Sequence, residues 1–143
     1  MFLGEPLVIK KMQIQYSIYQ SFLEIDCSEL VLSIIPNDAL WERRAINLKK
    51  SNFIIIAKKG NMVVGLLFAR RIFGVLNATW IVGDTARRQG IGDKMLKLLE
   101  QNVNCITAIC RNLPSLYLAK NCNFFTIGRF AIWIKFFSNG QKN

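Results

Sequence analysis

The stretch from Thr79 to Glu100 constrains the fold of this chain more than any other part of the sequence. Its apolar beginning ends at Val82, and a short turn containing Gly90 and Gly92 then leads directly into a segment whose apolar residues recur at helical spacing. This order predicts a strand, a glycine-rich turn and a helix in immediate succession. Such a turn can hold an anion, because glycines let the backbone approach a phosphate closely and the first N–H groups of a helix have no partner within it.

Positive charge reinforces this predicted anion site. Arg87 and Arg88 precede the glycines, and the start of a helix carries a partial positive charge. A diphosphate is therefore the expected ligand. Two common nucleotide motifs do not fit: the Gly-Lys-Ser/Thr of a P-loop is missing, and Met95 replaces the third glycine of a dinucleotide-binding turn.

Arg87, Gly90 and Gly92 have the spacing R-x-x-G-x-G, and at this point the sequence resembles the Gcn5-related N-acetyltransferase (GNAT) family. From Val82 onward it follows the family pattern V-x-P-x-x-R-x-x-G-x-G, with Asp84 in place of the proline. Members of that family bind the pyrophosphate of acetyl-CoA on this turn. The resemblance therefore implies acetyl-CoA as a co-substrate and no metal.

The resemblance covers roughly residues 53–124. Near its end Asn112 ends a predicted strand, and a helix leads from there to the aromatic Phe124, as in the family. The resemblance implies that Val82 and Asn112 contact the pantetheine arm, while the turn holds the pyrophosphate. The cofactor-binding residues that it implies are Ile81, Val82, Arg87, Arg88, Gln89, Gly90, Ile91, Gly92, Asp93 and Asn112.

The general acid and base of an acetyl transfer are harder to identify. Members of the family commonly use a tyrosine of the last helix to protonate the CoA thiolate, but the equivalent position here is Ala119. Tyr117 is the candidate that remains. Two residues along a helix correspond to about 200°, so its side chain should point elsewhere, or pack on the sheet. Asp84, beside the turn, is the carboxylate closest to the expected site and is a candidate general base. The other acidic candidates come from the N-terminal part: Glu24, Asp26, Glu29 and Glu42.

Three hypotheses for the function follow. The leading one is an acyl-CoA-dependent N-acetyltransferase, in which an amine of unknown identity attacks the thioester of acetyl-CoA directly. Losing one acid or base costs about 10²–10⁴-fold in rate, so a slow transferase is physically reasonable. The second is a catalytically weak or inactive acyl-CoA-binding regulatory protein, which the missing acid and base favour. The third is a GNAT-like protein that binds a polyanion such as tRNA.

The charge of the chain motivates the third hypothesis. The formal net charge is +10, which favours anionic partners. Lys and Arg often stand in adjacent pairs, but these are spread along the chain, and no nucleic-acid motif accompanies them. A generally solvated basic surface is the simpler interpretation. Nucleic acid therefore stays open as a partner without the support of a motif.

The cysteines and the missing histidines exclude several kinds of site. The chain has no His, and its four cysteines form no C-x-x-C pair. The common Cys/His zinc sites and His-dependent catalytic triads are therefore excluded. We expect small buried thiols at the four positions instead. These are Cys27, Cys105, Cys110 and Cys122.

Length and composition predict a single domain. With 143 residues, of which 52% are hydrophobic, the chain can bury a sizeable core. It has no apolar run of about 20 residues, as a membrane span needs, and its start does not read as a signal peptide. We therefore expect a cytoplasmic protein without a membrane partner. A GNAT-like domain over 1–143 would comprise an acceptor-side part at 1–52, an acyl-CoA-binding core at 53–124, and a C-terminal strand and tail at 125–143.

The apolar periodicity predicts an α/β fold: a mixed, mostly antiparallel central sheet flanked by helices on both faces. The resemblance implies the same architecture, the acyl-CoA N-acyltransferase fold. The predicted strands are 7–16, 53–57, 62–72, 76–83, 105–110 and 124–137, and the predicted helices are 17–31, 37–50, 90–101 and 114–122. Turns are predicted at 59–61, 73–74 and 128–129, with Asn123 as a left-handed cap after the last helix. The last strand is apolar on both faces, which predicts a core position first and the edge of a homodimer second.

Overall fold

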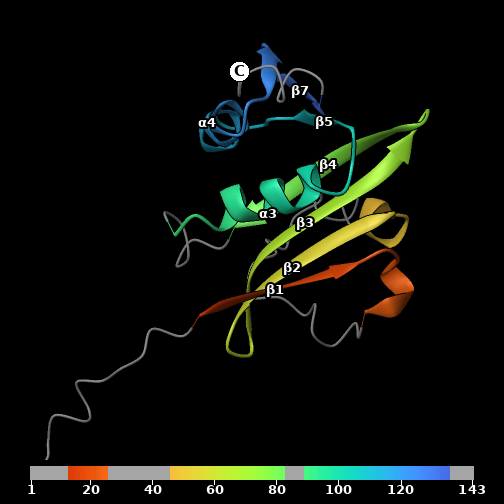
Figure 1. Cartoon of the computed structure of the whole chain (residues 1–143), viewed down its shortest axis with the longest axis vertical. Helices are drawn as coiled ribbons and strands as arrows, with labels where there is room; N and C mark the ends of the chain where they lie inside the picture. The colour runs from red at the N-terminus through yellow and green to blue at the C-terminus, as the bar shows by residue number, and fades with distance from the viewer. Residues whose placement is uncertain (1–12, 26–45, 83–88, 136–143) are drawn as a thin grey trace, which may run out of the picture.

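The computed structural model describes residues 13–25, 46–82 and 89–135, and the statements below concern these residues. They form one seven-stranded sheet with the strand order β1-β2-β3-β4-β5-β7-β6 (Figure 1). The strands are β1 (Ile14–Tyr19), β2 (Phe53–Lys59), β3 (Met62–Ile72), β4 (Val75–Val82), β5 (Cys105–Ile109), β6 (Phe125–Ile127) and β7 (Phe130–Ile134). β4 and β5 run parallel, and all other neighbours in the sheet run antiparallel. The predicted mixed, mostly antiparallel sheet is therefore confirmed.

Helical elements cover both faces of this sheet, as predicted. On one face α3 (Ile91–Glu100) and α4 (Leu113–Asn121) pack onto a core that extends from β2 to β7. Figure 1 shows α3 lying across β3 and β4. On the other face, Ile25 and Leu48 belong to a second, smaller core. Ile25 directly follows the short 3-10 helix η1 (Phe22–Glu24), and Leu48 lies in a helical segment at 46–49.

β2 and β3 form the interior of the sheet because their side chains are apolar on both faces. Ile54, Ile55 and Ile56 are fully buried, and they alternate between the two cores. A continuous apolar run of this kind is what a strand covered on both sides requires. The predicted buried strand at 53–57 is confirmed, and it continues to Lys59.

The predicted turns lie where the local residue types placed them. Gly60, between β2 and β3, has a φ of 64°, and Gly128, between β6 and β7, has a φ of 58°. Between β3 and β4 both Phe73 and Gly74 have positive φ, at 50° and 80°. Asn123, after α4, has a φ of 70°, which confirms it as the left-handed residue that ends this helix.

The prediction for the N-terminal part is confirmed for the strand at 14–16 and wrong for the helix that was to follow it. A helix was expected from residue 17, but β1 continues through Ser17 to Tyr19 before η1 begins. The reason is tertiary: β1 pairs with β2 from Ile14 opposite Lys59 to Tyr19 opposite Ile54, and this ladder outweighs the local preference. The remaining parts of the predicted strand and helices, at 7–12, 26–31 and 37–45, lie outside the described residues.

The C-terminal prediction needs one correction. The apolar segment 124–137 is two strands around the predicted turn, with Phe136 and Phe137 outside the described residues. β7 lies between β5 and β6, so it is not an edge strand; the edge is the three-residue β6. One face of β7 belongs to the core, with Ala131 and Trp133 buried, whereas Phe130 on the other face is exposed. In the described part of the chain, no helix has the length and apolar character needed to cross a membrane.

Candidate functional site

The parallel strands β4 and β5 separate after a short stretch of pairing. Their ladder joins only Leu76 to Ile106 and Asn77 to Thr107. At this point the Asn77 side-chain amide donates a hydrogen bond to Thr107 Oγ1 at 3.1 Å. Beyond it β4 continues to Val82, paired with β3 alone, and Figure 1 shows β5 leading away from it. Within the described residues, the outer backbone edge of β4 from Ala78 to Val82 therefore has no strand partner.

The two β4 residues predicted to contact a ligand lie on this unpaired edge. Ile81 and Val82 are the last residues of the strand and are both partly buried. Val82 faces the core beneath α3, and Ile81, as its neighbour in a strand, faces the opposite side. Successive residues of a strand present their backbone N–H and C=O groups to opposite edges, so one of these two residues presents its groups to the free edge, where they can bond an extended ligand.

The helix α3 begins with backbone N–H groups that no helical acceptor satisfies. Its N-cap is Gly90, with φ 74° and ψ 15°, and it provides no side-chain cap. The first helical hydrogen bond runs from Lys94 N to Gly90 O at 3.0 Å, so the N–H groups of residues 91–93 precede the helical ladder. An added Cβ at Gly90 would meet nothing within 4 Å. Glycine is thus favoured there by the left-handed backbone, not by crowding.

Gly92 has a packing role in addition to any role toward a ligand. A Cβ added at Gly92 would lie 2.6 Å from Leu118 Cδ2 of α4. Gly65 of β3 has a similar role, since its added Cβ would lie 2.7 Å from Ile91 Cγ2. The two glycines let the first turn of α3 approach both the sheet and α4.

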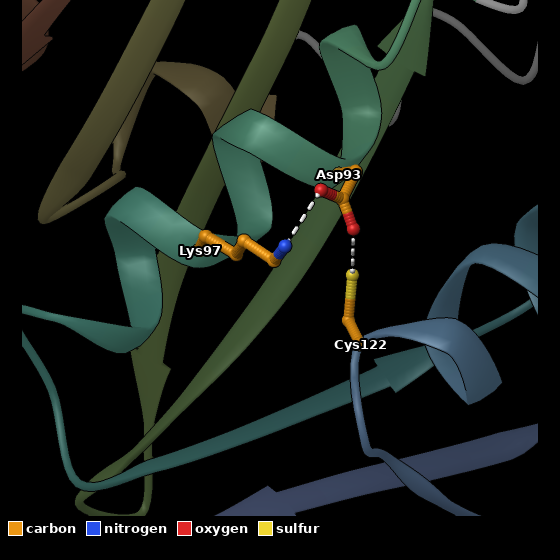
Figure 2. A network of polar contacts seen from close by, with 3 residues as sticks. All are labelled: Asp93, Lys97 and Cys122. Carbon is orange, nitrogen blue, oxygen red and sulfur yellow. Dashed lines mark hydrogen bonds and ion pairs between the residues drawn. The ribbon is translucent and has the colours of Figure 1, made fainter.

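Asp93 is held by neighbours on two elements (Figure 2). Its Oδ2 lies 3.1 Å from Lys97 Nζ, one turn later in α3. The thiol of Cys122, after α4, donates to its Oδ1 at 3.3 Å. The carboxylate raises the pKa of Lys97 through this contact, and burial, together with Asp93, raises the pKa of the Cys122 thiol. The negative charge of Asp93, close to a site expected to hold an anion, is thus balanced by Lys97.

Asn112 is the N-cap of α4. Its Oδ1 accepts a hydrogen bond from Ser115 N at 2.9 Å, and Pro114 occupies the first turn of the helix, as predicted. Because the side-chain oxygen caps the helix, the amide NH₂ is the group of Asn112 suited to reach a ligand.

The candidate acid does not face the core of the fold. Tyr117 is 57% exposed, whereas Ala119 is fully buried in the core under α4. The predicted difference in direction between the two positions is confirmed, and packing of Tyr117 on the sheet is not observed. Glu24 is exposed and accepts a hydrogen bond from Gln20 N at 2.8 Å. Six further predicted site residues lie outside the described ranges: Asp26, Glu29, Glu42, Asp84, Arg87 and Arg88.

Three features of this region had no signal in the sequence. Burial raises the pKa of Glu100, at the end of α3, to about 7, and the nearby Asp93 adds to this effect. The Asp93–Cys122 bond depends on residues 29 positions apart. Trp80 of β4 packs edge-on against Phe124, with ring centroids 6.3 Å apart. All three depend on which faces the tertiary structure covers.

The remaining cysteines follow the prediction in part. Cys110 and Cys122 are buried, Cys105 is partly exposed, and Cys27 lies outside the described residues. Burial raises the pKa of the Cys105 and Cys110 thiols. In the described ranges no three His, Cys, Asp or Glu residues gather as a metal ion would require.

Comparison with known proteins identifies the fold. Neither a scan against protein-family models nor a search of curated proteins finds a match. Among solved structures, the acetyltransferase of the GNAT family from Streptococcus pneumoniae aligns with a TM-score of 0.57 and 11% identity, over 84% of this chain and 99% of that chain. This chain has the GNAT fold.

Two further structures show the range of proteins with this fold. The yncA protein from Salmonella typhimurium, solved with its cofactor acetyl-CoA, aligns with a TM-score of 0.51 and 17% identity, over 85% of this chain and 94% of that chain. A chain of the KacTA–DNA complex aligns with a TM-score of 0.62 and 9% identity, over 91% of this chain and 98% of that chain. At such identities the likeness concerns the GNAT fold alone.

Proposed function

We propose that this protein is an N-acetyltransferase that moves an acetyl group from acetyl-CoA to an amine. The observation that carries the proposal is the start of α3 at Gly90, which has no side-chain cap and follows the end of β4 at Val82 by eight residues, where β4 has already separated from β5. The fold supports it, because yncA, which shares the GNAT fold, was solved with acetyl-CoA.

The residues at the start of α3 fit a pyrophosphate. The N–H groups of Ile91, Gly92 and Asp93 are available to phosphate oxygens, and the dipole of α3 favours negative charge there. Lys97 offsets the charge of Asp93. Gln89, Arg87 and Arg88 precede this turn in the chain, and the two arginines would add positive charge.

The free edge of β4 fits the pantetheine arm. That arm is extended and contains amides, so it can bond to unpaired backbone groups as an added strand does. One of the two residues Ile81 and Val82 presents such groups at this edge, and the amide NH₂ of Asn112 is a further donor. A backbone N–H of β4 would also polarise the thioester carbonyl.

The chemical step needs little beyond positioning. The amine nitrogen attacks the thioester carbonyl carbon, the C–N bond forms, the C–S bond breaks, and the sulfur leaves as thiolate. The amine proton passes to Asp84 or to water, and Tyr117 or water protonates the thiolate. An amine with a pKa of about 9 is about 1% neutral at pH 7, which costs about 2.7 kcal/mol. Positioning supplies roughly 7–11 kcal/mol, so transfer remains feasible without a strong base.

A regulatory acyl-CoA-binding protein is the second candidate. The exposure of Tyr117 and the buried alanine at position 119 favour it, because neither places an acid at the expected thiolate. Turnover of acetyl-CoA with a broad panel of amines would eliminate this candidate. Binding without turnover would eliminate the transferase instead.

Several finer assignments remain part of the proposal. They are a single domain over 1–143 with the acceptor shaped by 1–52, a cytoplasmic location, and an assembly as a homodimer. The acceptor is an amine whose identity no described residue specifies. Nucleic acid as a partner is supported by the charge of +10 and by the fold shared with a chain of the KacTA–DNA complex.

Isothermal titration with CoA tests the binding half of the proposal. We expect Arg87→Glu/Arg88→Glu to weaken CoA binding by about tenfold or more, since charge-assisted contacts to phosphate are lost. Lys49→Glu/Lys50→Glu is the matched control, because it makes the same change in net charge at an exposed pair elsewhere. Absence of binding at millimolar CoA, or equal effects of the two double variants, would refute the assignment.

A further inference from the structure

Two tryptophan side chains have buried N–H groups without a hydrogen-bond partner among the described residues. They are Trp80 of β4 and Trp133 of β7, each at Nε1. A buried donor without an acceptor costs free energy, so each such group in a folded protein needs an explanation. The two indoles lie in different surroundings, and only Trp80 lies beside the free edge of β4.

Trp80 lies in the part of β4 that has left β5. The β4–β5 ladder ends at Asn77, three residues earlier. Trp80 is opposite Leu67 of β3 and faces the core that α3 and α4 cover. Its ring packs edge-on against Phe124, which follows α4. The indole is therefore held between the free half of β4 and the end of α4.

The core-facing side chains of β4 lead from Trp80 toward the proposed pyrophosphate site. Val82 follows Trp80 on the same face, and its Cγ2 lies 3.6 Å from the Cβ position of Gly92 in the first turn of α3. A ligand that extends from the start of α3 along the free edge of β4 therefore passes Trp80.

Trp133 provides the contrast. It is 3% exposed and lies opposite Ile106, which belongs to the paired part of β5. β7 pairs with β5 along its whole length and with β6 from Phe130 to Ile132, so β5 occupies one backbone edge at Trp133 and the β6 ladder ends one residue before it. No described feature leads a ligand to its indole.

We infer that the Trp80 indole N–H donates a hydrogen bond to a carbonyl oxygen of the acyl-pantetheine arm. An indole is a donor only, and this arm carries carbonyl acceptors in its amides and in the thioester. The inference rests on the proposed function. Trp80 is then a binding residue that orients the pantetheine arm. The free-energy cost of leaving its indole N–H unpaired is recovered when the ligand binds.

The test compares Trp80→Phe with Trp133→Phe, since each removes one unpaired N–H and keeps an aromatic ring. We expect Trp80→Phe to weaken binding by about five- to tenfold in calorimetry, as loss of one neutral hydrogen bond does. Trp133→Phe should leave the affinity within about twofold. If CoA and acetyl-CoA are weakened equally, the acceptor is a pantetheine amide; if only acetyl-CoA is weakened, it is the thioester.

A fluorescence measurement gives a readout that does not depend on affinity. In the variant Trp41→Phe/Trp133→Phe, Trp80 is the one remaining tryptophan of the chain. Its emission should shift when CoA is added, because the environment of the indole N–H changes.

Unchanged affinity of Trp80→Phe for both ligands would overturn the inference, and so would an equal loss in Trp133→Phe. In either case binding by the wild-type protein would leave the proposed function intact. If the wild-type protein binds neither ligand, the proposed function itself fails. Thermal unfolding of both variants identifies a loss of binding that follows from misfolding.

Discussion

Asp93 illustrates how one side chain can serve both a helix and its neighbour. Its carboxylate bonds Lys97 within α3 and the Cys122 thiol after α4. A carboxylate in the first turn also suits the helix dipole. The residue was predicted to bind a ligand, and its observed contacts join two elements.

We expect Cys122→Ala to lower the free energy of unfolding by about 1–2 kcal/mol, because it removes a donor to a part-buried carboxylate. Cys122→Ser should be less destabilised, since a hydroxyl can donate in place of the thiol. Urea unfolding of the two variants measures the difference. Equal stabilities would show that the Asp93 contact contributes nothing.

Glu100 should make stability depend on pH. Its pKa in the folded protein is raised to about 7, mainly by burial, so the folded state binds the proton more tightly than the unfolded chain. Its contribution is fully present below about pH 4.5 and is lost as the pH rises through about 7. Because the group is only partly buried, we expect a loss of about 1 kcal/mol, well below that for the full shift.

Urea unfolding at pH 5 and pH 8 checks this expectation. Glu100→Gln should flatten the pH dependence between these values, and Glu24→Gln, which changes an exposed carboxylate, should not. A Glu100→Gln profile parallel to that of the wild type would contradict the assignment.

At the scale of elements, two glycines without side chains let α3 lie close to its neighbours. Gly65 on β3 and Gly92 in its own first turn each leave room for a neighbouring methyl group. The close approach brings the uncapped end of the helix beside the free edge of β4. The candidate site therefore depends on packing as much as on its own residues.

We expect Gly65→Ala to destabilise the fold by about 1–3 kcal/mol, the usual cost of overpacking a core. The new Cβ would lie 2.7 Å from Ile91 Cγ2, and Ile91 is 1% exposed. In an Ile91→Ala background the cost should shrink, because the clashing atom is gone. Chemical unfolding of the wild type, the two single variants and the double variant measures the coupling between the two residues. If the losses of unfolding free energy in the single variants add up to that of the double variant, this contact is ruled out.

At the scale of the whole molecule, one sheet face near the C-terminus is apolar and exposed. Ile109, Phe130 and Ile127 are aligned across β5, β7 and β6 and are 56%, 43% and 69% exposed. Phe125, on the same face of β6, is 64% exposed. Contiguous patches of this kind commonly mark contacts between proteins.

If the protein is a homodimer, this face and the adjoining edge of β6 are where a second copy should pack. Ile127→Lys should then shift the mass measured by light scattering from dimer toward monomer, because it places a charge in the contact. Met62→Lys, at an exposed residue at the start of β3, is the control. A monomeric wild-type protein would refute the dimer.

The net charge makes a separate prediction about nucleic acid. We expect any binding to be independent of base sequence and to weaken by about 10³-fold or more between 50 and 200 mM salt, as counterion release dictates. Electrophoretic shifts over a salt series measure this. A sequence-specific complex that persists at the higher salt would contradict it and strengthen the nucleic-acid hypothesis.

The features that the sequence predicted correctly depend on neighbouring residues. The turns at Gly60 and Gly128 follow from the freedom of glycine at positive φ, and Asn123 ends α4 in the left-handed conformation that asparagine tolerates. The apolar run of β2 and the helical spacing of α3 predicted which segments would be buried. Local chemistry determines such features, so most strands and the two longer helices were predictable.

Only the tertiary structure decided the features that join distant parts of the chain. β1 extends to Tyr19 because β2 lies beside it, and β4 leaves β5 after Asn77 because of how the sheet is assembled. The contact of Gly92 with Leu118 and the unpaired indole of Trp80 depend on residues far apart in sequence. Packing between such residues is not encoded in any local pattern, and it is this packing that surrounds the candidate site.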